Sequence, residues 1–343
     1  MRKLLNTLYI TTPDNYLSLE GETVLIRKNE ETVARLPLHN LEAIVTCGYT
    51  GISPALMGAC AERNICVTFL TQNNRFLARI IGESRGNVTL RKEQYRISDD
   101  EDRSCCIARN FIIGKIYNAK WIIERAKRDY SMRLDSEKLG TVSISLTELL
   151  VNVRNCLNLD QLRGFEGNAA NVYFSVFNML ILQQNDEFYF NGRNKRPPTD
   201  NVNALLSFVY TLLANDCASA IETVGLDAYV GFLHRDRPGR ISLALDLMEE
   251  LRGVMADRFV LSLINKKIVN GKGFNTQEDG AVLMDDETRK TVLGAWQTRK
   301  KEEIMHPFLE EKIEWGIVPY VQALLLARFI RGDLNEYPPF MWK

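Results

Sequence analysis

The sequence predicts an α+β multidomain protein, with a small β-rich domain at residues 1–84 followed by a large all-α domain at residues 85–343. Before residue 84, short runs rich in Thr, Val, Ile, Leu and Tyr alternate with turn residues, as in strands. From about Tyr95 onward, apolar residues recur at helical spacing instead. The length of 343 residues also exceeds what one ordinary core requires.

Strand-like segments open the predicted β domain. They are TLYIT (7–11), YLSLEG (16–21), TVLIRK (23–28), TVARLPL (32–38) and EAIVTC (42–47). A helix is expected to follow Ser53, because serine is a favoured N-cap and Pro54 suits the first helical position. ICVTFL (65–70) and RFLARIIGE (75–83) are then expected to form the last strands.

Long helical patterns dominate the second domain. They cover residues 105–129, 142–158, 204–225 and 318–333, and an amphipathic helix with a solvated charged face is expected over 285–303. Residues 240–264 are expected to form one long helix, with Leu243, Leu247, Leu251 and Met255 on an apolar stripe. Prolines fall between these segments, in NKRPPTDN, RDRPGR and IMHPF, where they do not interrupt a helix.

Composition excludes several classes of protein. The chain is 45% hydrophobic and 25% charged, and no apolar run reaches the roughly 18 residues of a membrane span, so we expect a cytoplasmic protein with no membrane contact. The seven cysteines include no C-x-x-C, which argues against a disulfide framework or a structural zinc site. Because 43 basic residues balance 43 acidic ones, any nucleic acid must be bound by local basic patches.

Glu166 is the first candidate for chemistry. On a helix, Glu166, Ala169, Ala170 and Tyr173 share one face, so an acid lies among small residues that allow another helix to approach closely. The alternative is a solvated first turn in which Glu166 merely favours the helix dipole.

A second candidate lies in LHRDRPGRISLALDLMEELR (233–252). Asp246, Glu249 and Glu250 follow His234 and are one helical turn apart, so two carboxylates could face one point. The alternative is ordinary surface charge, and Glu250 is expected on the surface. The other two histidines, His39 and His306, are interpreted as structural residues.

These acids with one imidazole suit a hard divalent ion. Oxygen ligands favour Mg²⁺ or Mn²⁺, whereas zinc would call for more His or Cys. Such an ion promotes phosphoryl transfer without a protein nucleophile. Basic residues near these segments could grip the phosphates beside a scissile bond: Arg193, Lys195, Arg196, Arg235, Arg237, Arg240, Lys266, Lys267 and Lys272.

Four motifs in order resemble those of one family. They are LRGFEGNAANVYF, NGRNKRPPTDNVNALLSFVYTLL, GLDAYVGFLHRDRPGRISLALDLMEELR and HPF. Together they resemble the CRISPR-associated adaptation integrase, a metal-dependent DNA endonuclease that inserts spacers into CRISPR arrays, and the resemblance spans nearly the whole chain. The segments KRPP and SLALDLMEE look most like those of type I systems.

The resemblance implies roles for particular residues. Glu166, His234 and Glu249 are implied as catalytic ligands of Mg²⁺ or Mn²⁺, and Asp246 as a nearby acid that some members also need. The DNA-binding set that we expect, partly from the resemblance and partly from the basic clusters, is Arg193, Arg196, Asn203, Tyr210, Arg235, Arg237 and Arg240. The chain departs from the family where relatives commonly read Asp-Pro-Val-Asn, since it has Asp200-Asn201-Val202-Asn203. A further departure is EELRG, where many members have a Phe and then a Pro after the arginine; both lie away from the implied ligands and leave only local turn geometry in doubt.

The resemblance also implies a reaction and an assembly. A 3′-hydroxyl of the spacer precursor attacks a phosphodiester of the repeat in double-stranded or branched DNA, by transesterification. Homodimers, formed through residues 1–84, flank a dimer of the small companion adaptation protein in a heterohexamer. Two other functions stay open on the residues alone: a non-catalytic helical scaffold that binds nucleic acid, and a metal-dependent phosphoesterase acting on another substrate.

Overall fold

The computed structural model describes residues 7–10, 13–29, 31–41, 43–63, 65–71, 76–80, 82, 88–194 and 197–343. The chain divides into two compact units, Met1–Gly86 with Asp286–Glu302, and Asn87–Asp285 with Glu303–Lys343. The first is rich in strands and the second in helices, which confirms the predicted α+β class. The predicted domain boundary between residues 84 and 85 lies outside the described residues.

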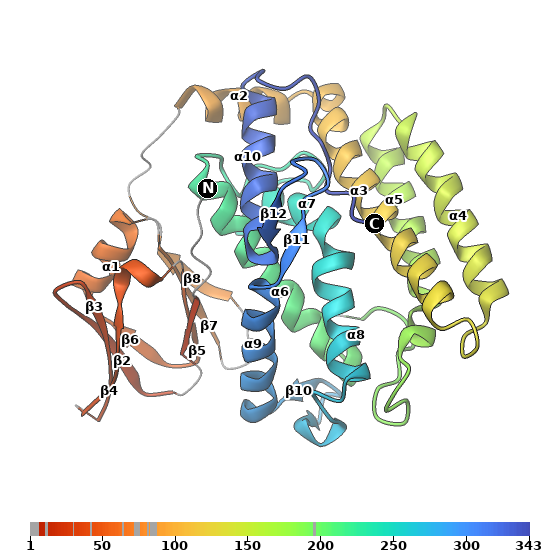
Figure 1. The fold of residues 1–343 in the computed structure, drawn as a ribbon. Coiled ribbons are helices and arrows are strands. Elements are labelled where there is room, and N and C mark those ends of the chain that lie inside the picture. The colour runs from red at the N-terminus through yellow and green to blue at the C-terminus, as the bar shows by residue number, and fades with distance from the viewer. Residues whose placement is uncertain are drawn as a thin grey trace. The chain divides into compact units, whose positions relative to one another are not determined.

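Two four-stranded sheets form the first unit (Figure 1, red and orange). One sheet has the order β1 (Thr7–Ile10), β5 (Ala43–Cys47), β7 (Cys66–Leu70) and β8 (Phe76–Ile80), and β8 alone is antiparallel to its neighbour. The other has the order β4 (Glu31–Pro37), β3 (Thr23–Lys28), β2 (Asn15–Glu20) and β6 (Thr50–Ile52), in which only β2 and β6 are parallel. The strands agree with the predicted segments, and β6 is an additional short strand.

Helices accompany these sheets. Helix α1 (Pro54–Glu62) begins as predicted, because the Ser53 side chain accepts a hydrogen bond from the Leu56 backbone N–H at 3.2 Å. Helix α9 (Asp286–Lys300) groups with the same unit and lies within the predicted amphipathic segment. Arg289 and Lys300 are nevertheless buried, so the expectation that its charged residues are solvated is only partly correct.

Eight helices account for most of the second unit's described residues. They are α2 (Val88–Ser98), α3 (Glu101–Asp129), α4 (Ser136–Arg154), α5 (Leu159–Phe174), α6 (Asn201–Thr223), α7 (Ser242–Leu251), α8 (Arg258–Asn265) and α10 (Val318–Ile330). Two short antiparallel ladders were not expected: β9 (Phe274–Thr276) with β10 (Val282–Met284), and β11 (Glu303–Met305) with β12 (Lys312–Glu314). Short 3₁₀ turns complete the described part of the chain: η1 (Leu38–Asn40), η2 (Phe177–Leu180), η4 (Gly271–Gly273) and η5 (Trp315–Ile317).

Helices α3 and α6 organise this unit. Helix α3 starts where the Asp100 carboxylate accepts the backbone N–H groups of Asp102 and Arg103, and it packs against α4, α5 and α7. Among the described residues, α6 alone has the length and apolar composition of a possible membrane span. Two thirds of that apolar stretch is buried inside the structure, as in the central helix of a packed core.

The predicted long helix over 240–264 is interrupted. Helix α7 starts at Ser242 and is followed by a π-helical segment, η3 (Arg252–Asp257), before α8. The predicted apolar stripe is confirmed, since Leu243, Leu247, Leu251 and Met255 are all buried. A π-segment inserts an extra residue into a helix and often occurs at functional sites. Here it directly follows the acidic cluster.

Candidate active site

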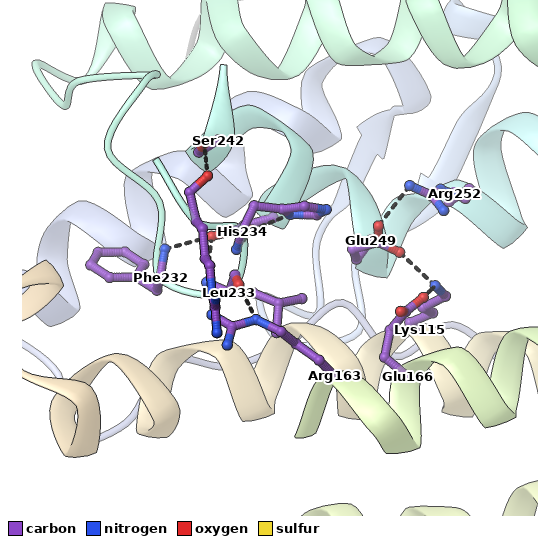
Figure 2. A network of polar contacts seen from close by, with 11 residues as sticks. Lys115, Arg163, Glu166, Phe232, Leu233, His234, Ser242, Glu249 and Arg252 are labelled. Carbon is purple, nitrogen blue, oxygen red and sulfur yellow. Dashed lines mark hydrogen bonds and ion pairs between the residues drawn. The ribbon is translucent and has the colours of Figure 1, made fainter. Parts of the chain in front are cut away.

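Asp246 fixes the loop that carries His234. Its fully buried carboxylate accepts backbone N–H groups of Phe232 at 2.6 Å, Leu233 at 2.9 Å and His234 at 3.0 Å. It also lies 2.6 Å from Nδ1 of the His234 imidazole. A proton on Nδ1 satisfies this contact and leaves Nε2 with a lone pair, which is the arrangement found in metal-binding histidines. Figure 2 shows the loop residues beside the helices.

Helix α5 is joined to the same loop. Arg163 donates from Nε to the carbonyl of Leu233 at 2.9 Å, and its guanidinium pairs with Asp160 at 2.6 Å. The loop before α7 is therefore fixed from two sides, by Asp246 from α7 and by Arg163 from α5. This matters because a ligand or catalytic group has to be held within a fraction of an ångström of its working position.

Two glutamates from different helices meet around one lysine. Lys115 of α3 lies with Nζ 2.7 Å from Oε2 of Glu249 on α7, and it also pairs closely with Oε1 of Glu166 on α5. Arg252 contacts the other oxygen of Glu249 at 2.6 Å. The side chains of Glu249, Lys115 and Glu166 are 3%, 12% and 27% exposed, so the cluster is shielded but reachable from solvent on the side of Glu166. The alternative in which Glu166 occupies a solvated first turn is wrong.

The charge of Glu249 is set by two opposing effects. Burial raises the pKa of this carboxyl. The nearby charges of Arg252, Lys115 and His234 lower the pKa by more than burial raises it, and the pKa is about 2. Glu249 is thus ionised at any ordinary pH. A carboxylate that is ionised is in the form that a metal ion requires of its ligand.

The arrangement can be tested against the donor set that a divalent ion needs. Among the residues that the structure describes, no three His, Cys, Asp or Glu side chains are gathered closely enough to hold a metal ion. The Lys115 ammonium lies between the two carboxylates, with Nζ 2.7 Å from the buried Oε2 of Glu249. In Figure 2 the His234 ring extends toward Glu249. Two carboxylates and an imidazole are donor types that hard ions use, but here the Lys115 ammonium lies between the carboxylates.

Glu250 corrects one of the predictions. We expected it on the surface, but it is fully buried. Its carboxylate accepts the Phe340 backbone N–H at 2.8 Å and the Gln322 side-chain amide at 3.0 Å, and it pairs closely with the Tyr337 hydroxyl. Burial raises the pKa of Glu250 to about 7, against the effect of these donors. Glu250 therefore anchors the C-terminal segment rather than facing solvent.

Three of the predicted DNA-binding residues, the buried Asn203 and the half-buried Arg193 and Tyr210, contact one another in a polar network. Asn203 is completely buried and accepts a hydrogen bond from Arg193 at 2.6 Å. Arg193 in turn stacks over the ring of Tyr210 at 5.2 Å, and burial lowers the pKa of its guanidinium. These residues brace the region around Arg252, which stacks over the same ring at 5.0 Å. Arg196 lies outside the described residues.

The Tyr210 hydroxyl donates to a buried acid at the end of the π-segment, Asp257, at 2.5 Å. Burial raises the pKa of Asp257 to about 6, although Tyr210 and two arginines oppose that rise. The network therefore runs continuously from Glu249 through Arg252 and Tyr210 to Asp257.

The other arginines of the predicted DNA-binding set, apart from Arg196, follow His234 on its loop. Arg235 and Arg237 are exposed, Arg240 is half-buried, and Arg235 pairs with Asp160 at 3.1 Å. His306 is structural, as predicted, because its buried ring contacts the Gln322 side chain at 3.1 Å and accepts backbone N–H groups at Nδ1. His39 is exposed on the first unit.

Sequence reasoning missed Lys115, Arg252 and Asp257. A signal for Lys115 was present, because this lysine lies inside FIIGKIYNAKWII, an otherwise apolar helical run. A lysine at a buried helical position needs an anionic partner. No comparable signal marks Asp257, whose inward direction depends on the π-segment.

Comparison with known proteins provides independent evidence. The family model described as "CRISPR associated protein Cas1" matches residues 8–298. A protein named "CRISPR-associated endonuclease Cas1 1" from Chlorobaculum tepidum is 49% identical over 343 residues, with both chains covered completely. Among solved structures, a casposase bound to integration product has a TM-score of 0.85 at 20% identity, covering 98% of this chain and 94% of that one. A Cas6-RT-Cas1–Cas2 complex has a TM-score of 0.82 at 21% identity, covering 98% of this chain and 36% of that one.

Proposed function

Because the chain belongs to the CRISPR-associated Cas1 family, we propose that it is a metal-dependent DNA endonuclease and integrase of CRISPR adaptation. The observation that carries this proposal is the meeting of Glu166 and Glu249 around a single cation, with His234 directed toward them. The three side chains come from α5, α7 and the loop before α7.

Glu166, Glu249 and the Nε2 atom of His234 would hold Mg²⁺ or Mn²⁺. When bound, such an ion supplies positive charge that stabilises the reacting phosphate and favours ionisation of the attacking hydroxyl. Asp246 keeps the imidazole oriented through Nδ1. Arg252 keeps the carboxylate of Glu249 in place through its other oxygen.

The reaction that we propose is transesterification. The 3′-hydroxyl oxygen of a spacer precursor forms a new bond to a phosphorus atom at the leader–repeat boundary, and the bond from that phosphorus to the existing 3′-oxygen breaks. One phosphodiester replaces another, and the hydroxyl proton ends on the leaving 3′-oxygen. A second attack on the opposite strand completes insertion. The protein positions the groups and needs no nucleophile of its own.

DNA contacts divide into two kinds in this proposal. Arg235, Arg237 and Arg240 follow His234 directly and are available to phosphates beside the reacting bond. Arg196 is proposed for the same role on sequence grounds. Asn203 is buried and Arg193 and Tyr210 are half-buried, and these three side chains act indirectly, by holding Arg252 in place.

The assembly is also a proposal. We infer a cytoplasmic homodimer formed through residues 1–84, which joins the small companion adaptation protein in a heterohexamer on double-stranded and branched DNA. The solved complex that shares this fold contains a chain named Cas2 beside Cas1. Support for the subunit count comes from family resemblance alone.

A joining assay on branched duplexes tests the function. Wild-type protein is expected to nick or join these DNAs only with Mg²⁺ or Mn²⁺, and His234→Ala is expected to abolish the reaction because one ligand is lost. His39→Ala, an exposed histidine on the other unit, is the matched control and should retain activity.

Other outcomes would support the competing functions. If His234→Ala and Glu166→Ala retained full DNA activity while changes at Arg235 and Arg237 abolished it, a nucleic-acid-binding scaffold would replace the integrase. If the protein hydrolysed small phosphoesters and ignored branched duplexes, a phosphoesterase on another substrate would replace it.

A further inference from the structure

Lys115 occupies the position between the two carboxylates that would ligate a metal ion. Its ammonium contacts Glu249 at 2.7 Å and pairs closely with Glu166. We propose that Lys115 is a positioning residue that closes the metal site and is displaced when a divalent ion binds. This inference rests on the proposed function, since it concerns the ion of the same site.

Charge explains why the lysine and the ion exclude each other. Glu166, Glu249, Lys115 and Arg252 together carry no net charge, so the cluster is electrically balanced as it stands. A dication entering between the same two carboxylates would lie next to the ammonium inside a shielded site. Repulsion between like charges is strong where solvent screens poorly. The ion therefore binds only when the ammonium withdraws.

The structure provides a place for the displaced ammonium. A cavity of about 20 Å³ lies beside Lys115, and its lining includes Ala169, Ala170, Asp257 and the cation Arg252. That volume holds about one water-sized group, and the alanines leave it unobstructed. Asp257 supplies a buried carboxylate on the cavity wall. Lys115 thus has a carboxylate partner in either direction, Glu166 and Glu249 as the structure stands, and Asp257 across the cavity that Arg252 also lines.

The small residues of α5 leave room for this movement of Lys115. Ala169 and Ala170 follow Glu166 by one helical turn and face the same cavity. Larger side chains at these positions would fill the space into which the ammonium moves. The face of small residues beside Glu166 is therefore explained by the movement of Lys115, in addition to the close approach of helices.

Manganese affinity measured without DNA tests the proposal. Isothermal titration of the full chain, freed of metal with EDTA and dialysed, should give a dissociation constant about tenfold lower for Lys115→Met than for wild type. Tenfold is the gain expected if Lys115 closes the site in about nine molecules of ten. Lys120→Met, on the same helix, is the matched control and should leave the affinity unchanged. Lys115→Arg, which keeps the cation, should bind Mn²⁺ no more tightly than wild type.

A second variant tests the destination of the ammonium. Asp257→Asn removes the alternative anionic partner and should weaken Mn²⁺ binding, whereas the same change in Lys115→Met protein should have a much smaller effect. Thermal denaturation with and without Mn²⁺ supplies an independent readout, with the larger metal-induced rise in Tm expected for Lys115→Met. Lys115→Gln serves the same purpose if the methionine variant does not fold.

The possible failures are distinguishable. If Lys115→Met bound Mn²⁺ as wild type does, or more weakly, the closing role would be overturned while the proposed function stood. If neither wild type nor the variant bound Mn²⁺, the metal site of the proposed function would be overturned along with it.

Discussion

Three acidic residues within five positions of α7 have three different environments. Glu249 and Glu250 point about 100° apart on the helix and Asp246 lies one turn before them, so the three carboxylates meet different neighbours. Asp246 faces the His234 loop, Glu249 faces Lys115, and Glu250 faces the C-terminal segment. Each carboxylate has a distinct task because its partners differ, and none of the three lies on the surface.

At the residue scale, Asp257 makes stability depend on pH. Its folded-state pKa of about 6 lies above the ordinary value of 3.8, because of burial. The folded protein therefore holds this proton more tightly than the unfolded chain, and the corresponding stability is lost as pH rises from about 4 to 6. A rise in pKa from 3.8 to about 6 corresponds to on the order of 3 kcal/mol of folding stability.

We expect Asp257→Asn to remove this contribution. The free energy of unfolding of wild type minus that of the variant should fall by on the order of 3 kcal/mol between pH 4 and pH 7. Urea denaturation of both proteins in EDTA at several pH values measures the difference. A constant difference across this range would contradict the raised pKa.

At the element scale, α3 and α7 approach closely at a glycine. A Cβ atom on Gly114 would lie 2.8 Å from Cβ of Glu250 and 3.3 Å from Cβ of Pro339. Neither neighbour is the free end of a flexible side chain, so the helices themselves would have to separate. Gly114 therefore allows the contact that brings Lys115 and Glu249 together.

Gly114→Ala should destabilise the protein by about 1–3 kcal/mol, the usual cost of overpacking a core. Gly164→Ala on α5 is the matched control, because a Cβ there meets no atom within 4 Å. The control should instead be stabilised by roughly 0.5–1 kcal/mol, the helical preference of alanine over glycine. Equilibrium urea denaturation measures both, and equal effects of the two changes would argue against close packing at Gly114.

The helices show what local sequence can and cannot predict. The N-cap at Ser53, the strands of the first unit other than β6, and the apolar stripe from Leu243 to Met255 follow from neighbouring residues and were predicted correctly. The π-segment was not predicted, because no local pattern distinguishes it from continued α-helix. Its register decides that Arg252 and Asp257 both face Tyr210.

The environment of Glu250 could not be predicted for a different reason. Its partners, Gln322, Tyr337 and Phe340, come more than seventy residues later in the chain. No periodicity links these positions, so an acid in an otherwise apolar helix looked like surface charge. The candidate metal ligands were expected from residue type and motif resemblance. Lys115, which lies between two of them, belongs to a third helix, so its place in the site could not be predicted from those motifs.

At the scale of the whole molecule, the candidate site depends on the helical unit as assembled. Its side chains come from α3, α5, the loop before α7 and α7 itself. The C-terminal segment closes the far side of α7, and Asn118 of α3 donates to the carbonyls of Glu250 and Phe340, at 2.7 Å each. The geometry around Lys115 is therefore a property of the folded unit and not of any single motif.

Anomalous scattering from crystals soaked in Mn²⁺ tests the central claim most directly. The account predicts one strong peak bounded by Glu166, Glu249 and Nε2 of His234, with the Lys115 ammonium moved away from both carboxylates toward Asp257. A peak at another site, or a manganese ion bound with Lys115 still between Glu166 and Glu249, would contradict it.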